Sequence, residues 1–196
     1  IIANNGVIFI ESARKATHFI QLANKSNTPL LFIHNTTGFM VGKKHEQNGM
    51  INSGSQLIHA VAGSTVPHIS LQVGNSYGAG NYAMCGRSFN PRFLFSYPNS
   101  KSGVMGADQL AGVMEIVKRR SAKSLNKEID EKLLLEEKKM LAEQADKKAS
   151  VWHTTSEVWD DGVIDPRETR KYLSLSLAAV YNSEIKGSDS FGVFRM

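Results

Sequence analysis

A turn rich in glycine and alanine follows a short apolar run near the middle of the chain, and it constrains the fold more than any other feature. The run at 67–73 (PHISLQV) is typical of a buried strand, and the turn at 74–80 (GNSYGAG) leads into a helix-compatible segment. Where a strand is followed by a tight turn and a helix, several main-chain N–H groups at the start of the helix face the same place. The positive end of the helix dipole lies behind them. The sequence therefore predicts a place that suits an anion or an oxygen that gains negative charge.

Four interpretations of this turn stay open when the turn is taken alone. Residues 74–78 match the G-x-S-x-G nucleophile elbow of serine hydrolases, and residues 78–83 match the loose dinucleotide pattern G-x-G-x-x-A. The third interpretation is an oxyanion hole of main-chain amides, and the fourth is a structural turn whose glycines allow close packing. A hydrolase with Ser76 as nucleophile needs a later His, and only His153 follows; a dinucleotide site needs an earlier acid than Asp108.

Strands and helices alternate along the chain, which predicts an α/β fold with a mostly parallel sheet. Strands are expected at 6–10, 29–35, 67–73 and 91–98, with a short segment at 102–106, and helices at 11–27, 43–62, from about 107, within 118–150, at 152–159 and at 166–181. Two glycine-rich loops, 36–42 and 76–80, follow consecutive strands. Because parallel strands place their carboxyl ends at one edge of a sheet, we expect the two loops to lie side by side.

Composition excludes several classes of protein. A chain of 196 residues with 41% hydrophobic and 21% charged residues is expected to form one globular domain. No apolar run approaches the ~20 residues that cross a bilayer, and the net charge of +5 comes without a basic patch interleaved with aromatics, so neither a membrane nor nucleic acid is expected as a partner. The single cysteine, Cys85, excludes an internal disulfide and is expected to lie in the core. The chain begins without Met, as if cut from a longer one.

Both loops together carry a resemblance to a known family. The runs are 34–42 (HNTTGFMVG), followed by Glu46 and Gly49, and 76–87 (SYGAGNYAMCGR). They resemble the carboxyltransferase (β) subunit of biotin-dependent acyl-CoA carboxylases, and the likeness is closest to the β subunit of methylcrotonyl-CoA carboxylase and its geranyl-CoA relatives. The resemblance extends over essentially the whole chain, through 91–95, 104–106, 159–167 and 191–196.

The resemblance implies a fold and an assembly. Such subunits contain two domains of the ClpP/crotonase superhelix type, built of ββα-type units, and residues 1–196 resemble the C-terminal one alone. The resemblance implies that the missing N-terminal carboxyltransferase domain of another subunit completes the active site, in a homo-oligomer expected to be a hexamer of β subunits. It also implies a biotin-carrying α subunit as partner, no metal in this domain, and a location in the mitochondrial matrix for a eukaryotic source or the cytoplasm for a bacterial one.

The resemblance also implies a reaction, the transfer of CO2 from carboxybiotin to an acyl-CoA such as 3-methylcrotonyl-CoA, which forms a C–C bond. The main-chain amides of Ala79 and Gly80 are expected to hold the biotin oxygen, while biotin itself serves as the base. The residues expected to shape the biotin and substrate site are Gly38, Phe39, Val41, Gly42, Tyr77 and Gly78. A bulky side chain at Gly80 is expected to abolish transfer with the fold intact. Alternatives are a non-catalytic assembly half-domain and a carboxylase for geranyl-CoA or propionyl-CoA.

Other chemistry-bearing residues are predicted to be structural. His34 ends a strand and is expected to be a satisfied core histidine, and Glu46 is expected to pack or cap near the start of its helix. Asp160 and Asp161 resemble a paired-carboxylate site, but the glycine and proline that follow them favour a turn.

Overall fold

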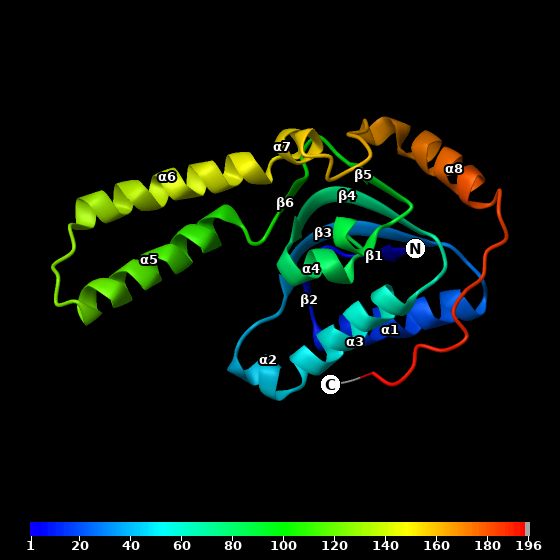
Figure 1. The fold of residues 1–196 in the computed structure, drawn as a ribbon, viewed down its shortest axis with the longest axis horizontal. Coiled ribbons are helices and arrows are strands. Elements are labelled where there is room, and N and C mark those ends of the chain that lie inside the picture. The colour runs from blue at the N-terminus through cyan, green and yellow to red at the C-terminus, as the bar shows by residue number, and fades with distance from the viewer. Residues whose placement is uncertain (195–196) are drawn as a thin grey trace.

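The computed structural model describes residues 1–194 and contains one sheet of six strands, in which each pairing between strands is parallel. Two long strands form its centre, β3 (Leu30–Phe39) and β4 (His68–Tyr77), and they pair with each other. β3 also pairs with β1 (Ile2–Ala3) and β2 (Gly6–Ile8), and β4 also pairs with β5 (Phe93–Ser96) and β6 (Lys101–Gly103) (Figure 1). The expected α/β fold with a mostly parallel sheet is confirmed.

Helices cover both faces of this sheet. α1 (Ile10–Lys25) and α3 (Met50–Gly63) lie on one face, where the larger core forms (Figure 1). α8 (Thr169–Val180) contributes Tyr172 to a smaller cluster on the other face. The remaining helices are α2 (Lys43–Gln47), α4 (Gly78–Ala83), α5 (Ala107–Ser124), α6 (Glu131–Ala149) and α7 (Val151–Ser156), with short 3-10 turns at Arg87–Phe89 and Pro166–Glu168.

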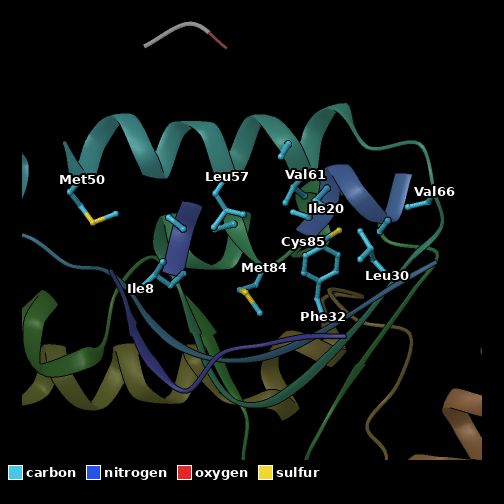
Figure 2. Packing of buried hydrophobic residues seen from close by; sticks show 14 residues of the cluster. Ile8, Ile20, Leu30, Phe32, Met50, Leu57, Val61, Val66, Met84 and Cys85 are labelled. Carbon is cyan, nitrogen blue, oxygen red and sulfur yellow. The ribbon is translucent and has the colours of Figure 1, made fainter. Parts of the chain in front are cut away.

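The larger core holds α3 and α4 against β3. Leu57 and Val61 point from α3 into the core, Leu57 toward Met84 and Val61 toward Cys85, as Figure 2 shows. Cys85 is fully buried in this core, which confirms the expectation for the single thiol. It follows α4 in a left-handed conformation (φ 58°), and burial raises the pKa of its thiol to about 12, so the side chain is an inert packing group.

β3 and β4 run further than their apolar patterns predict. The strands were expected to end at 35 and 73, but they continue to Phe39 and Tyr77. Their second halves bury polar side chains and pair with β2 and β6, so hydrogen bonds replace apolar burial there. Thr36 of β3 stands opposite Ser76 of β4, which confirms that the two glycine-rich segments lie side by side.

Two expected helical segments are each divided in the structure. The helix predicted over 43–62 breaks between α2 and α3 at Gly49, whose φ of +94° suits glycine and ends the first helix. The charged segment 118–150 forms the end of α5 and all of α6, and the two helices make a hairpin that extends away from the sheet (Figure 1). Asp130 caps α6 by accepting hydrogen bonds from two main-chain N–H groups.

The C-terminal run that carries part of the family resemblance includes Arg195 and Met196, which lie outside the described residues. Within 1–194, no helix combines the length and the apolar character that crossing a membrane requires.

Candidate functional site

The glycine turn forms the start of α4, as the sequence predicts. Gly78 adopts a φ of +53°, and a Cβ on it would lie 2.8 Å from the carbonyl oxygen of Val104, so glycine suits both the conformation and the space. The N–H groups of Ala79 and Gly80 lie in the first turn of α4, where a helix supplies no acceptor four residues earlier. These are the two main-chain donors that the oxyanion prediction invokes.

Gly80 allows a close approach between α4 and β3. A Cβ on Gly80 would lie 2.9 Å from the Cα of Gly38 and 3.0 Å from Cγ2 of Thr36. The main chains therefore meet in a space that admits no side chain. The expectation that a bulky residue at position 80 leaves the fold intact stays a prediction, and the structure adds that β3 and α4 would have to shift to admit such a residue.

A cavity of about 560 Å³ lies against the start of α4, within the size range of small-molecule sites. Gly78 and Ala79 line it, whereas Gly80 and Gly38 are not among its lining residues. The rest of the lining comes from the sheet, α4 and the segments around α7: Gln72, Asn81, Tyr82, Arg87, Ser88, Ser96, Ser102, Gly103, Val104, Thr154, Trp159 and Asp160.

The other residues predicted to shape the site lie outside this cavity. Phe39 is half-buried and packs against the larger core, where its ring contacts Gly54. Val41 is 75% exposed, and Gly42 is exposed ahead of α2 with a φ of +121°. Tyr77 is buried beside Gly103 of β6, and burial is the main cause that raises the pKa of its hydroxyl. The structure therefore brings Gly78 and Ala79 into the cavity and distributes the remaining predicted residues around it.

A buried network of hydrogen bonds connects the glycine turn to β3 and β4. Ser76 Oγ lies 3.0 Å from Nδ1 of His34 and accepts a hydrogen bond of 2.8 Å from Nδ2 of Asn81. Burial lowers the pKa of His34 to about 4, so the imidazole is neutral at ordinary pH. Ser76 is fully buried and its histidine partner is His34, not His153, which disfavours the exposed nucleophile that a hydrolase elbow requires.

The paired aspartates, Asp160 and Asp161, make contacts beyond the turn in which they lie. Asp161 accepts a 2.7 Å hydrogen bond from the main-chain N–H of Leu94 and forms an ion pair of 3.1 Å with Arg87. It therefore connects β5 with the segment after α4. Asp160 is buried, lines the cavity and accepts from the hydroxyl of Thr155. Both aspartates lie in a bend, as predicted, and their carboxylates make further contacts that the prediction did not include. Glu46, in contrast, caps α2 through the N–H of Gly42, at 3.4 Å, as expected.

The sequence interpretation missed two polar residues of the cavity, Gln72 and Ser96. Both lie in runs that otherwise read as apolar strands, and both are at least 94% buried, with exposed fractions of 6% and 1%. The signal that could have found them is a polar residue at the carboxyl end of a buried parallel strand, where α/β folds place their ligands.

Comparisons with known proteins agree on one family. Residues 1–193 match the carboxyl transferase domain. The chain is 52% identical, over its whole length, to the probable biotin-dependent acyl-coenzyme A carboxylase beta2 subunit of Mycobacterium tuberculosis, of which it covers 37%. It is 46% identical, again over its whole length, to the mitochondrial methylcrotonoyl-CoA carboxylase beta chain of Dictyostelium discoideum, of which it covers 34%.

Solved structures show the same likeness. The beta subunit of P. aeruginosa geranyl-CoA carboxylase superposes with a TM-score of 0.84 at 46% identity, over 97% of this chain and 36% of that one. The transcarboxylase 12S core superposes with a TM-score of 0.79 at 23% identity, over 97% of this chain and 35% of that one, which shows the fold.

The chain spans between 34% and 37% of the length of these relatives. Its α/β architecture is the expected crotonase-like fold. On the match over residues 1–193 and the identity to the beta subunits, the chain belongs to the carboxyl transferase domain family of biotin-dependent acyl-CoA carboxylases.

Proposed function

We propose that this chain forms one wall of a carboxyltransferase active site, in which CO2 passes from carboxybiotin to an acyl-CoA. One observation carries the proposal beyond family membership: the first turn of α4, with Ala79 in it, lines a cavity of about 560 Å³. The cavity is large enough for a small ring system, and its surface is mostly apolar, with polar and aromatic side chains such as Gln72, Tyr82 and Trp159 in the lining. These features fit the ring of biotin.

The proposed role of the chain is to stabilise charge. Biotin, when bound, supplies the ring nitrogen that carries CO2 and a ureido oxygen that becomes negative as CO2 leaves. The N–H groups of Ala79 and Gly80 donate to that oxygen, and the positive end of α4 adds to the stabilisation. Gly78 permits the main-chain turn that places them, and the network of His34, Ser76 and Asn81 fixes the turn on the sheet.

The acyl-CoA is proposed to be 3-methylcrotonyl-CoA, because beta chains named for that activity match over the whole chain. Geranyl-CoA and propionyl-CoA are alternatives, and the geranyl-CoA carboxylase beta subunit is a relative of equal identity. Since this chain covers about a third of those proteins, we propose that an N-terminal domain selects the acyl group.

The proposed assembly has three further parts. An N-terminal carboxyltransferase domain of a second subunit faces the cavity, an α subunit carries biotin, and the β subunits form a hexamer, as the transcarboxylase 12S core is described. The location proposed is the mitochondrial matrix for a eukaryotic source, as for the Dictyostelium relative, and the cytoplasm for a bacterial source.

The test removes one main-chain donor and leaves the side chain small. Ala79→Pro deletes the N–H in the first turn of α4, where proline is tolerated, and Ala79→Ser is the matched control because it keeps that N–H. In the subunit that joins this chain to its N-terminal domain, we expect Ala79→Pro to lower kcat for carboxyl transfer about 100- to 1,000-fold. We expect Ala79→Ser to transfer at close to the wild-type rate. Equal kcat in both variants, with circular dichroism unchanged, would contradict the oxyanion role.

An assembly role is the second candidate, and the α5–α6 hairpin favours it. The hairpin extends from the body (Figure 1). Its apolar side chains Val117, Leu133 and Leu135 are exposed. If the chain only assembles, Ala79→Pro should leave transfer unchanged, whereas charged substitutions at these three positions should abolish it by dissociating the subunits.

A further inference from the structure

The helix α4 ends in a buried residue with a left-handed main chain. Cys85 has a φ of 58°, and its N–H donates to the carbonyl of Tyr82 at 3.1 Å. The next N–H, of Gly86, donates to the carbonyl of Asn81 at 2.8 Å, and the two hydrogen bonds form a Schellman motif. Glycine or asparagine usually occupies the left-handed position, because a Cβ strains the main chain there. Main-chain preference therefore does not explain the cysteine.

Other helices of the chain end in the same motif. The left-handed residue is Asn27 after α1, Asn126 after α5 and Val158 after α7. These three side chains are exposed, whereas Cys85 has an exposed fraction of 0%. The side chain of Cys85 thus lies where it can make contacts that hold the end of its helix.

The strand β4 supplies two polar contacts to Cys85. His68 and Ser70 are two positions apart on this strand, so their side chains lie on the same face. Nδ1 of His68 lies 3.2 Å from Sγ of Cys85, and Oγ of Ser70 donates to the carbonyl of Cys85 at 2.7 Å. Burial lowers the pKa of His68 to about 4 and raises the pKa of the thiol to about 12. The pair is therefore a neutral hydrogen bond and not a thiolate–imidazolium nucleophile.

The imidazole of His68 is itself fixed by its surroundings. Its Nε2 lies 2.7 Å from Oγ of Ser64, which also accepts a 2.8 Å hydrogen bond from Nδ2 of Asn24 in α1. The ring meets Phe32 of β3 edge-on, with 5.3 Å between the ring centres. Contacts from three sides therefore hold Nδ1 in place beside the thiol of Cys85.

The helix is short enough for its end to position its start. It spans Gly78–Ala83, and the N–H of Met84, directly after it, donates to the carbonyl of Gly80 at 3.1 Å. A Cβ on Gly80 would lie 2.9 Å from the Cα of Gly38, so there is little space between the first turn of α4 and β3. A displacement of Cys85 is therefore transmitted to the first turn, which lines the cavity.

We propose that His68 and Cys85 are positioning residues for carboxyl transfer, which hold α4 and its first turn in place against the sheet. Neither residue lines the cavity, so each acts through α4 and not on the substrate. The inference rests on the proposed function and deepens it, because it assigns a role to a buried pair outside the cavity. It requires that the hydrogen bond between the two side chains, and not only their volume, affects the rate of transfer.

The first experiment compares two substitutions that keep a Cβ in the left-handed position. Cys85→Ala removes the hydrogen bond to His68, whereas Cys85→Ser keeps a hydroxyl in its place. The protein is the subunit that joins this chain to its N-terminal domain. We expect Cys85→Ala to lower kcat for carboxyl transfer about 10- to 100-fold, because a displacement of ~1 Å at a reacting site can cost ~100-fold. The KM for the acyl-CoA should stay near its wild-type value, and Cys85→Ser should restore kcat.

A double-mutant cycle assigns the effect to the pair. His68→Leu should lower kcat as Cys85→Ala does, and the double variant should be no slower than either single variant, because both substitutions remove the same hydrogen bond. If Cys85→Ala does not fold, His68→Leu and His68→Gln make the same comparison from β4. Asn126→Gly is the matched control: it changes the left-handed residue of the same motif at the end of α5 and should leave kcat unchanged.

Amide hydrogen exchange in the same subunits reports whether α4 is displaced. Peptides that contain Gly78–Ala83 should exchange faster in Cys85→Ala than in the wild type, and Cys85→Ser should restore the slower exchange. Peptides from α6, Glu131–Ala149, should exchange equally in all three proteins.

The inference stands if exchange in α4 and kcat both change in Cys85→Ala and both return in Cys85→Ser. Faster exchange with a wild-type kcat would assign the pair to the fold alone and overturn the inference. An equal kcat in the alanine and serine variants, a lower kcat with unchanged exchange, or additive losses in the double-mutant cycle would also overturn it. Ala79→Pro decides the oxyanion role separately. If that variant transfers at the wild-type rate while Cys85→Ala is slow and Cys85→Ser is not, the oxyanion role is wrong and the positioning of α4 stands.

Discussion

The imidazole of His34 and the hydroxyl of Ser76 join β3 to β4 directly beneath the proposed oxyanion turn, with 3.0 Å between Nδ1 and Oγ. Ser76 Oγ also accepts a hydrogen bond from Nδ2 of Asn81, so one hydroxyl connects β3, β4 and α4. Nε2 of His34 is buried without a partner among the described residues, so the expected satisfied core histidine is paired at one ring nitrogen only. Burial lowers the pKa of His34 to about 4, which keeps the imidazole neutral at ordinary pH.

This contact predicts how substitutions at His34 affect stability. His34→Leu fills the site but removes the imidazole partner of the buried Ser76 hydroxyl, and we expect it to lower the free energy of unfolding by about 1–3 kcal/mol. His34→Gln retains a polar partner and should lose less. Urea denaturation of the three proteins measures both values. If the leucine and glutamine variants are equally stable, the hydroxyl does not depend on position 34.

Two buried histidines predict a stability that falls in mild acid. Burial lowers the pKa of both His34 and His68 from 6.5 to about 4, so the unfolded chain binds more protons than the folded chain between these values. Stability is therefore full above pH 6.5 and declines as the pH falls toward 4. Between pH 7.5 and pH 5, each histidine should remove about 2 kcal/mol of unfolding free energy. His34→Gln and His68→Gln should each reduce this decline in urea denaturation at the two pH values; an unchanged decline in both would contradict the burial effect.

The sequence predicted where the central strands begin, because apolar runs mark burial. The predicted starts at 29 and 67 lie one residue before the observed starts of β3 and β4 at Leu30 and His68. Their carboxyl ends were missed because polar side chains there have hydrogen-bond partners on other strands, as Ser76 of β4 has in His34 of β3. Hydropathy along one strand does not record such pairing.

The site was predictable only where its chemistry is local. Gly78 and Ala79 follow from the glycine turn, which a short segment specifies by itself. The contact of Asp161 with Leu94 was missed because the two residues lie 67 positions apart, and Gln72 and Ser96 come together through the register of β4 and β5. Long-range pairing of this kind has no signature in a single run of residues.

The contact between Gly80 and Gly38 predicts a steric effect that can be measured apart from catalysis. Even the methyl group of Gly80→Ala would lie 2.9 Å from the Cα of Gly38, so β3 and α4 must shift, and we expect a loss of about 1–3 kcal/mol. Gly112→Ala is the control, because nothing lies within 4 Å of a Cβ on that residue of α5. It should stabilise the chain by about 0.5–1 kcal/mol through helix propensity. The same sign in both variants would show that the close approach is absent in solution.

The last prediction concerns Asp161, which pairs with Arg87 at the cavity and with the N–H of the buried Leu94. The ion pair itself is partly exposed and contributes little, whereas the main-chain N–H of Leu94 loses its 2.7 Å acceptor when the carboxylate is removed. We expect Asp161→Ala to lower the free energy of unfolding by about 1–3 kcal/mol, and Asp161→Asn, which keeps an acceptor oxygen, to cost less.

Glu184→Ala is the matched control for Asp161. It removes one carboxylate from a pair with Lys186 in which both side chains are 77% exposed, so the unfolding free energy should change by less than about 0.5 kcal/mol. Urea denaturation of the three variants separates the two contributions. If Asp161→Ala were no more destabilising than Glu184→Ala, the carboxylate would not hold β5, and the cavity wall formed by Arg87 and Ser96 would have to be positioned by other contacts. If Asp161→Asn were as damaging as Asp161→Ala, the charge on Arg87 would be the important partner, and the loss should then diminish as salt screens the pair.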